Sequence, residues 1–252
     1  MADRLRSVLR SVARRITPCG RGARLRAPRF DYQTLYEAHA RAHAGSDAVG
    51  DGDFDAVGRG ELEILRQNGL GPDSDLLDFG CGIGRLAKFA IPYLVSGSYT
   101  GVDVAPTMIE RARAAFGSTG AGCRVRWAVQ TEAHFEFRAE SFDMICAFSV
   151  FTHLEHEDTF RYLADARRIV RPNGRFVFTC LPIQSPWGQR AFLDSARDDL
   201  PERWRKVRNV ATSPDLIASV AGLAGWHVLP FERAEQGQTV LVLQPGPRDR
   251  ST

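Results

Sequence analysis

From residue 75 onward, short apolar runs alternate with stretches of helical pattern, and this alternation constrains the fold more than any other feature of the sequence. Strands are expected, in chain order, at residues 76–79, 98–104, 123–129, 142–150 and 175–181. The segments between them predict helices at 84–94, 106–116 and 157–170. Apolar strands that alternate with helices form a parallel sheet that is covered on both faces.

The last part of the chain has a different pattern. A helix is expected at 213–224, and two apolar strands follow it around a short polar turn that contains Gly237. Two strands joined by so short a turn run antiparallel. The sequence therefore predicts an α/β fold, a three-layer sandwich. Its mostly parallel seven-stranded sheet has a C-terminal antiparallel hairpin and helices on both faces.

The pattern divides the chain into three parts. Residues 1–29 are a basic arm, amphipathic or disordered, and residues 73–252 form the main α/β domain. Residues 30–72 are expected to be an N-terminal helical cap, with a helix at 31–45, a loop at 46–57 and a second helix from 59 to 68. The length of 252 residues fits one such domain.

The N-terminal arm carries nine arginines and one acidic residue, whereas acidic side chains outnumber basic ones in the remainder. Apolar residues recur at helical spacing over 4–16, with arginines on the other faces. One interpretation is a short helix that makes peripheral contact with an anionic membrane surface. A solvated extension or a targeting peptide is the alternative. We expect no nucleic-acid partner, because aromatic residues do not interleave with the arginines.

Cysteine usage and hydropathy predict the compartment. The five cysteines are scattered and none forms a CxxC pair, which favours a reducing environment. No run of 18 apolar residues and no secretory signal pattern is present. We therefore expect a cytoplasmic protein, associated with a membrane surface if the arm binds one.

The first strand ends in a glycine-rich turn, LLDFGCGIGRLAKF, at residues 76–89. Ligands of open α/β sheets lie beyond the carboxyl ends of the strands, and glycines let the backbone approach them closely. Two patterns fit this turn. Gly82 to Ala87 matches the dinucleotide pattern GxGxxA, whereas Asp78 to Gly84 matches DxGxGxG. Asp103 ends the next strand at the distance expected for a ribose-binding acid in both, so the glycines alone leave the ligand open.

Four segments in order resemble the class I S-adenosylmethionine (SAM)-dependent methyltransferases. They are LLDFGCGIGRL, TGVDVAPTMIERAR, SFDMICAFSVFTHL and RIVRPNGRFVFT. The resemblance covers about residues 58–244, with Asn173 where the family often has glycine and a looser stretch after the third strand. It implies a Rossmann-like enzyme of the seven-stranded type with SAM as its cofactor.

The resemblance also assigns roles to individual residues. It implies that Asp78 orients the glycine loop, that the backbone of the loop passes the methionine part, and that Asp103 accepts both ribose hydroxyls. Glu132 and Ala133 correspond to an acidic–hydrophobic pair near the adenine amine. The expected cofactor-binding residues are Asp78, Gly80, Cys81, Gly82, Gly84, Asp103, Val104, Met108, Glu132, Ala133, Phe148 and Ser149.

The methyl acceptor is expected to be a small molecule or a glycan or lipid-linked compound, methylated at oxygen. The fourth strand is followed by FSVFTHL and not by an Asn-Pro-Pro-Tyr motif typical of amino acceptors. An oxygen acceptor needs a base near neutral pKa, and His153 is placed for this role. The acceptor pocket is expected between residues 30–60 and 182–212, with Tyr32, Tyr36, His39 and Trp187 as candidate substrate contacts.

Other activities are less well supported by the sequence. His39 and His43 lack the glutamate of an HExxH site, so no metal is expected. A protein that binds SAM or its product without catalysis is one alternative, which the intact glycines and Asp103 disfavour. An NAD(P)-dependent oxidoreductase that uses GxGxxA is the other.

Overall fold

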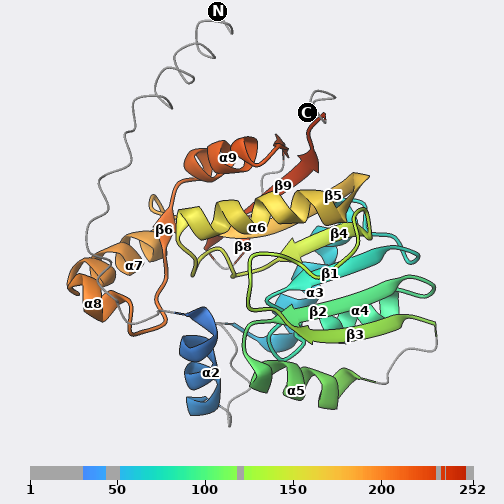
Figure 1. Ribbon diagram of the computed structural model, residues 1–252, viewed down its shortest axis with the longest axis horizontal. Coiled ribbons are helices and arrows are strands. Elements are labelled where there is room, and N and C mark those ends of the chain that lie inside the picture. Colours follow the sequence, from blue (N-terminus) through green and yellow to red (C-terminus); the bar gives the residue numbers. More distant parts are fainter. Residues whose placement is uncertain (1–30, 44–51, 118–121, 231–233, 236, 248–252) are drawn as a thin grey trace, which may run out of the picture. The chain divides into compact units, whose positions relative to one another are not determined.

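The computed structural model describes residues 31–43, 52–117, 122–230, 234–235 and 237–247 (Figure 1). Tyr32–Thr252 form one compact unit, and Met1–Asp31 form a separate unit of which only Asp31 is described. The arm interpreted as a membrane contact, residues 4–16, lies outside the described residues. Within the described part, no helix has the length and apolar character needed to cross a bilayer.

The core of the unit is a sheet in which seven strands follow the order β3-β2-β1-β4-β5-β9-β7. The first five strands in chain order are parallel, and β9 lies antiparallel between β5 and β7. Two short strands extend the sheet, β6 beside β5 and β8 beside β9. The strands are β1 Asp75–Phe79, β2 Ser98–Asp103, β3 Arg124–Val129, β4 Phe142–Ala147, β5 Val170–Pro182, β6 Ala211–Thr212, β7 Trp226–Leu229, β8 Ala234–Glu235 and β9 Gln238–Pro245. The predicted fold class, with its C-terminal antiparallel strands, is confirmed.

Helices cover both faces of this sheet (Figure 1). The described helices are α2 Tyr32–Ala42, α3 Phe54–Gln67, α4 Ala87–Tyr93, α5 Pro106–Phe116, α6 His156–Ile169, α7 Pro186–Ala196, α8 Leu200–Arg203 and α9 Pro214–Leu223. Successive strand residues point to opposite faces, so β5 sends Phe176 and Phe178 into the core under α6 and α9. Val177, between them, packs into the second core, under α3, α4 and α5.

Two helices begin at other residues than the sequence pattern predicts. The helix expected over 84–94 begins at Ala87, because Gly84 has a φ of 91° that no helical residue adopts. The helix expected from residue 59 begins at Phe54 instead. Asp53 caps it by accepting a hydrogen bond from the Ala56 N–H at 2.7 Å, which the apolar periodicity alone did not reveal.

The order of the strands places a ligand site at one edge of the sheet. β1 lies between β2 and β4, so the chain reverses its direction of winding beside β1. At such a switch point the connections leave toward opposite faces and open a crevice at the carboxyl ends of the strands. The glycine turn follows β1, Asp103 ends β2, and Phe148 and Ser149 follow β4, so these residues meet there.

Candidate functional site

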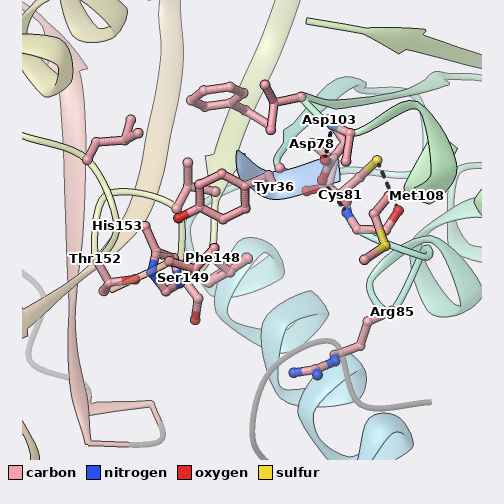
Figure 2. A pocket seen from close by; sticks show the side chains of 18 of the residues that line it. Tyr36, Asp78, Cys81, Arg85, Asp103, Met108, Phe148, Ser149, Thr152 and His153 are labelled. Carbon is pink, nitrogen blue, oxygen red and sulfur yellow. Dashed lines mark hydrogen bonds between the residues drawn. The ribbon is translucent and has the colours of Figure 1, made fainter. Parts of the chain in front are cut away.

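A cavity of about 510 Å³ occupies the crevice at the carboxyl ends of the strands (Figure 2). This volume is within the range of small-molecule sites. Figure 2 shows Asp78, Cys81 and Asp103 on one side, Thr152 and His153 on the other, and Tyr36 between the two groups. All the expected site residues line the cavity except Gly84, Glu132 and Ala133.

Asp78 is buried beneath the glycine turn, at 4% exposure. The Tyr99 hydroxyl donates to its Oδ2 at 2.5 Å, and the Cys146 thiol lies 3.6 Å from its Oδ1. Burial raises the pKa of this carboxyl to about 6, although both contacts act in the opposite direction. Asp78 is therefore a carboxylate whose charge is costly unless a cationic group lies nearby.

Asp103 ties the end of β2 to the glycine turn. Its Oδ2 accepts the Gly82 N–H at 3.0 Å, and its Oδ1 accepts the Ala105 N–H at 2.9 Å. Burial raises the pKa of this carboxyl, while the backbone donors lower it. A carboxylate has about four acceptor positions, so each oxygen keeps one for a ligand hydroxyl.

The cavity is apolar next to Asp103. Val104, between β2 and α5, and Met108, in the first turn of α5, line it there, in agreement with their expected role in cofactor binding. Cys81 is buried in the turn, and burial raises the pKa of its thiol well above the ordinary value, which suits a small packing residue and not a reactive thiolate.

The third strand contributes a residue that the sequence pattern did not single out. Gln130 follows β3 directly, lines the cavity, and donates through Nε2 to the carbonyls of Glu132 and His134 at 2.5 and 2.9 Å. This turn leaves Glu132 exposed, so neither it nor Ala133 is among the cavity-lining residues. The sequence could have indicated Gln130 as a site residue, because it directly follows β3, the strand beside β2.

Ser149 follows β4 in an unusual conformation. Its φ is 56°, which is uncommon for a residue other than glycine, and the strand expected to reach residue 150 ends at Ala147. The Ser149 N–H donates to Thr179 Oγ1 at 2.8 Å, and Gln238 Nε2 donates to Ser149 Oγ at 2.8 Å. Neighbouring strands β5 and β9 thus hold this strained residue against the cavity.

His153 lines the cavity on the same side. Its Nδ1 lies 2.9 Å from the Arg208 carbonyl, which can only accept, so Nδ1 carries the proton and Nε2 has a free lone pair. Burial lowers the pKa of this imidazole from its ordinary value of 6.5. The ring of Tyr36 meets His153 edge-on, at 6.0 Å between centroids. His153 is therefore a neutral acceptor of protons at pH 7.

The four candidate substrate contacts come from two helices, one before β1 and one after β5. Tyr32, Tyr36 and His39 line the cavity from α2, and Trp187 lines it from α7. The Tyr32 hydroxyl donates to Asp158 Oδ2 at 2.9 Å, which holds α2 near the start of α6. The structure thus brings the four residues to one cavity.

Charge distinguishes the two ligands that the glycine patterns allow. Two carboxylates, the buried Asp78 and the half-buried Asp103, flank the turn on the cavity side. A pyrophosphate placed there would meet like charges, whereas a cationic ligand would relieve the cost of these two carboxylates. An adenosine with a ribose diol and a cationic amino-acid part fits this donor and acceptor set.

The segment that runs from β1 into β5 matches a known protein family. Residues 76–174 match the family model described as "Methyltransferase domain". Magnesium protoporphyrin IX methyltransferase from Synechocystis PCC 6803, solved with bound SAM, superimposes with a TM-score of 0.61 over 86% of this chain and 98% of that chain, at 15% identity. Residues 76–174 therefore form a methyltransferase domain, and the fold of the described chain is that of SAM-dependent methyltransferases.

Curated relatives share part of this domain. The chain is 27% identical over 148 residues to the uncharacterized methyltransferase YodH of Bacillus subtilis (strain 168), which covers 49% of this chain and 60% of YodH. It is 31% identical over 134 residues to malonyl-[acyl-carrier protein] O-methyltransferase of Paenibacillus sp. (strain JDR-2), which covers 52% of this chain and 46% of that protein. The matches therefore span about half the length of these relatives.

Proposed function

We propose that this protein transfers a methyl group from SAM to an oxygen of a small-molecule, glycan or lipid-linked acceptor. The observation that carries the proposal is one cavity in which the buried Asp78 and the half-buried Asp103 lie across from a neutral His153. The relationship to a malonyl-[acyl-carrier protein] O-methyltransferase supports oxygen as the acceptor atom.

The cofactor would be held by residues from β1, from the end of β2 and from the start of α5. Asp103 accepts the ribose hydroxyls, Val104 and Met108 border the adenine, and Asp78 faces the cationic end. When bound, SAM supplies an activated methyl group for in-line displacement, so positioning of the acceptor provides much of the rate. The glycines of the turn admit the ligand, because Gly80 and Gly82 have φ values of 77° and 54° and carry no side chain.

His153 would act as the general base. Its Nε2 is the unprotonated nitrogen, and it can take the proton of an acceptor hydroxyl as the oxygen attacks. The Arg208 carbonyl fixes this tautomer and stabilises the proton on Nδ1. Tyr36 packs against the ring and limits access of water.

The first experiment is calorimetric titration of S-adenosylhomocysteine (SAH) into the wild type and Asp103→Ala. We expect micromolar binding by the wild type and a loss of about 10- to 100-fold in the variant, since hydrogen bonds to a charged group are worth about 1.5–3 kcal/mol. Glu110→Ala, an exposed acidic residue of α5, is the matched control and should bind as the wild type does.

Two outcomes would contradict this proposal. NAD(P) binding without SAH binding would return the glycine turn to the dinucleotide interpretation. SAH binding by a protein that methylates no acceptor would favour a non-catalytic SAM-binding partner protein instead.

We also propose a cytoplasmic location with peripheral membrane contact through residues 4–16, on the basis of their basic amphipathic pattern alone. Flotation with vesicles that contain anionic lipid tests this contact. Replacing Arg4, Arg6 and Arg10 by serine should abolish flotation and leave SAH binding unchanged. A wild-type protein that does not float with the vesicles would overturn the proposal.

A further inference from the structure

The cavity has a second half, away from the two carboxylates, that we call the acceptor chamber. Apolar residues such as Leu154 and Leu181 line the cavity, and the polar and aromatic lining residues of this half are Ser149, Thr152, His153, Trp187, Asn209 and Gln238. The last three lie outside residues 76–174, which match the methyltransferase domain model. Half of these chamber residues therefore come from segments that the domain model does not cover.

Two buried side chains of the chamber have an oxygen without a hydrogen-bond partner among the described residues. Gln238 is 6% exposed and its Oε1 is unpaired, while its Nε2 donates to Ser149 Oγ. Thr152 is 2% exposed and its Oγ1 is unpaired. Buried polar atoms in native proteins are nearly always paired, so each of these oxygens requires an explanation. A bound ligand that donates hydrogen bonds to these two oxygens would explain them.

A hydrogen bond between Gln238 and Ser149 orients both side chains in the chamber. The Gln238 Nε2 donates to the oxygen of Ser149, so the Ser149 hydroxyl hydrogen is free to be donated elsewhere. Ser149 is held at a φ of 56°, and strain of this kind concentrates at ligand sites. Oε1 belongs to the same amide group and accepts hydrogen bonds, so Gln238 can bind a donor in the chamber while its Nε2 stays on Ser149.

The acceptor chamber has no cationic side chain of lysine or arginine among its described lining residues. Arg208 contributes its carbonyl to His153, and its guanidinium pairs with Glu155. Arg85, the one arginine that lines the whole cavity within the described chain, lies on the opposite side from Thr152 and His153 (Figure 2). A carboxylate acceptor would therefore enter this half without a counter-charge.

The lining instead combines neutral hydrogen-bonding groups with aromatic rings. Hydroxyl and amide groups come from Ser149, Thr152, Asn209 and Gln238, and Trp187 adds an aromatic ring. Tyr36 lies against His153 at the border of the chamber. Rings that carry several hydroxyls need this combination, because their hydroxyls both donate and accept while their C–H faces pack on aromatic side chains.

We propose that the acceptor chamber binds a neutral ring with adjacent hydroxyls, such as a sugar or a cyclitol. Gln238 and Thr152 determine its specificity: they bind a hydroxyl next to the one that His153 deprotonates. The inference rests on the proposed function, and it names the class of acceptor for the same site.

Saturation-transfer NMR on the SAH-saturated protein tests this inference. The probes are methyl glucopyranoside, methyl mannopyranoside, methyl galactopyranoside and myo-inositol, with malonate and 4-methylphenol as the charged and apolar comparators. We expect at least one polyol to bind at millimolar concentration and both comparators to bind about tenfold more weakly. Binding of a pyranoside alone would identify a sugar, and binding of inositol alone a cyclitol.

Variants separate specificity from cofactor binding. Gln238→Leu and Thr152→Val should weaken polyol binding about tenfold and leave the SAH affinity within twofold of the wild type. The matched controls are Gln244→Leu and Thr239→Val, on the same strand β9 but outside the cavity lining, and they should bind polyols as the wild type does. Thr152→Val changes the shape little, so it carries the test if Gln238→Leu does not fold.

Three results would overturn the inference. They are tighter binding of malonate than of every polyol, no polyol binding by a protein that binds SAH, and polyol binding that both variants retain. Absence of SAH binding by the wild type would contradict the proposed function, and the inference with it, so the two failures are distinguishable.

Discussion

Two carboxylates in one cavity have different surroundings and therefore different tasks. Asp103 accepts two backbone N–H groups and keeps acceptor positions for a ligand. Asp78 has a hydroxyl and a thiol as its neighbours and lies 4% exposed behind the turn. Asp78 thus links β1 to β2 and β4 at an electrostatic cost in the ligand-free protein, and a cationic ligand would reduce that cost.

Asp78→Asn should remove a pH dependence of stability. The folded-state pKa of about 6 exceeds the ordinary 3.8, so between these values the native state keeps a proton that the unfolded chain has lost. The contribution of Asp78 to wild-type stability therefore falls as the pH rises through this window, by about 2–3 kcal/mol at 1.4 kcal/mol per unit. Urea unfolding at pH 4 and pH 7.5 measures this contribution. From pH 4 to pH 7.5, the free energy of unfolding of the variant should rise by this amount relative to that of the wild type.

The control for this measurement is Asp73→Asn at an exposed site beside β1. It should follow the wild type at both pH values. If Asp78→Asn also follows the wild type, the Asp78 carboxyl is not responsible for the pH dependence.

His153→Gln should reduce turnover and spare cofactor binding. Removal of a general base lowers kcat by about 10²- to 10⁴-fold, whereas the SAH affinity should stay within twofold. The wild-type rate should rise with pH through an apparent pKa below 6.5, because burial lowers the pKa of His153 and only the neutral form accepts a proton. If the rate of the His153→Gln variant still rises with pH in the same way, His153 is not the group whose titration causes the rise.

At the scale of elements, α2 connects the two sides of the cavity mouth. Thr107, in the first turn of α5, donates to Glu37 through its N–H at 3.0 Å and its hydroxyl at 2.5 Å. Tyr32, at the other end of α2, donates to Asp158 of α6. Figure 1 shows α2 beside α5, away from the layered helices. The helix is held by a few polar contacts and a small apolar cluster, so it is suited to open and close over the site.

Glu37→Ala should loosen α2 without affecting the sheet. Loss of two hydrogen bonds to Thr107 is expected to accelerate amide hydrogen exchange over residues 32–42 about five- to tenfold. The Thr107 hydroxyl lowers the pKa of Glu37, so this contribution is present at neutral pH and is lost as the pH falls through the lowered pKa. Exchange measured by mass spectrometry should be unchanged in β1 and β4.

Glu63→Ala is the matched control, because Glu63 forms its side-chain hydrogen bonds within the described residues to Arg66 and Gln67 of its own helix. Unchanged exchange of α2 in Glu37→Ala would show that the hydrogen bonds between Glu37 and Thr107 do not stabilise the helix.

At the scale of the whole molecule, the sequence predicts the layers better than the site. The helix at 106–116 was predicted with its correct bounds, because Pro106 sets its first turn and Gly117 follows its end. Asp78, Asp103 and Ser149 could be placed at one edge because each ends a strand. Gln238 could not, since it reaches Ser149 only after β9 pairs with β5 across the sheet. The His153 tautomer likewise depends on Arg208, which is 55 residues away in the sequence.

The final strand in the sequence is an interior strand of the sheet, which makes folding depend on the C-terminal segment. β9 pairs with β5 from Phe176 opposite Leu243 to Cys180 opposite Thr239, and with β7 on its other side. Its residues 240–243 are buried alternately in the two cores. Burial of four such side chains contributes on the order of 6–12 kcal/mol, which matches the net stability of a typical domain of 5–15 kcal/mol.

A chain that ends at Leu229 should therefore lose its cooperative unfolding transition. It lacks β9, so β5 has an unpaired edge, β7 has no neighbour, and Gln238 is missing from the acceptor chamber. A chain that ends at Pro247 keeps every described strand and should unfold as the full-length protein does. Thermal melts followed by circular dichroism compare the three chains. A cooperative transition in the Leu229 chain, together with SAH binding, would mean that the five parallel strands form a stable core without the C-terminal hairpin.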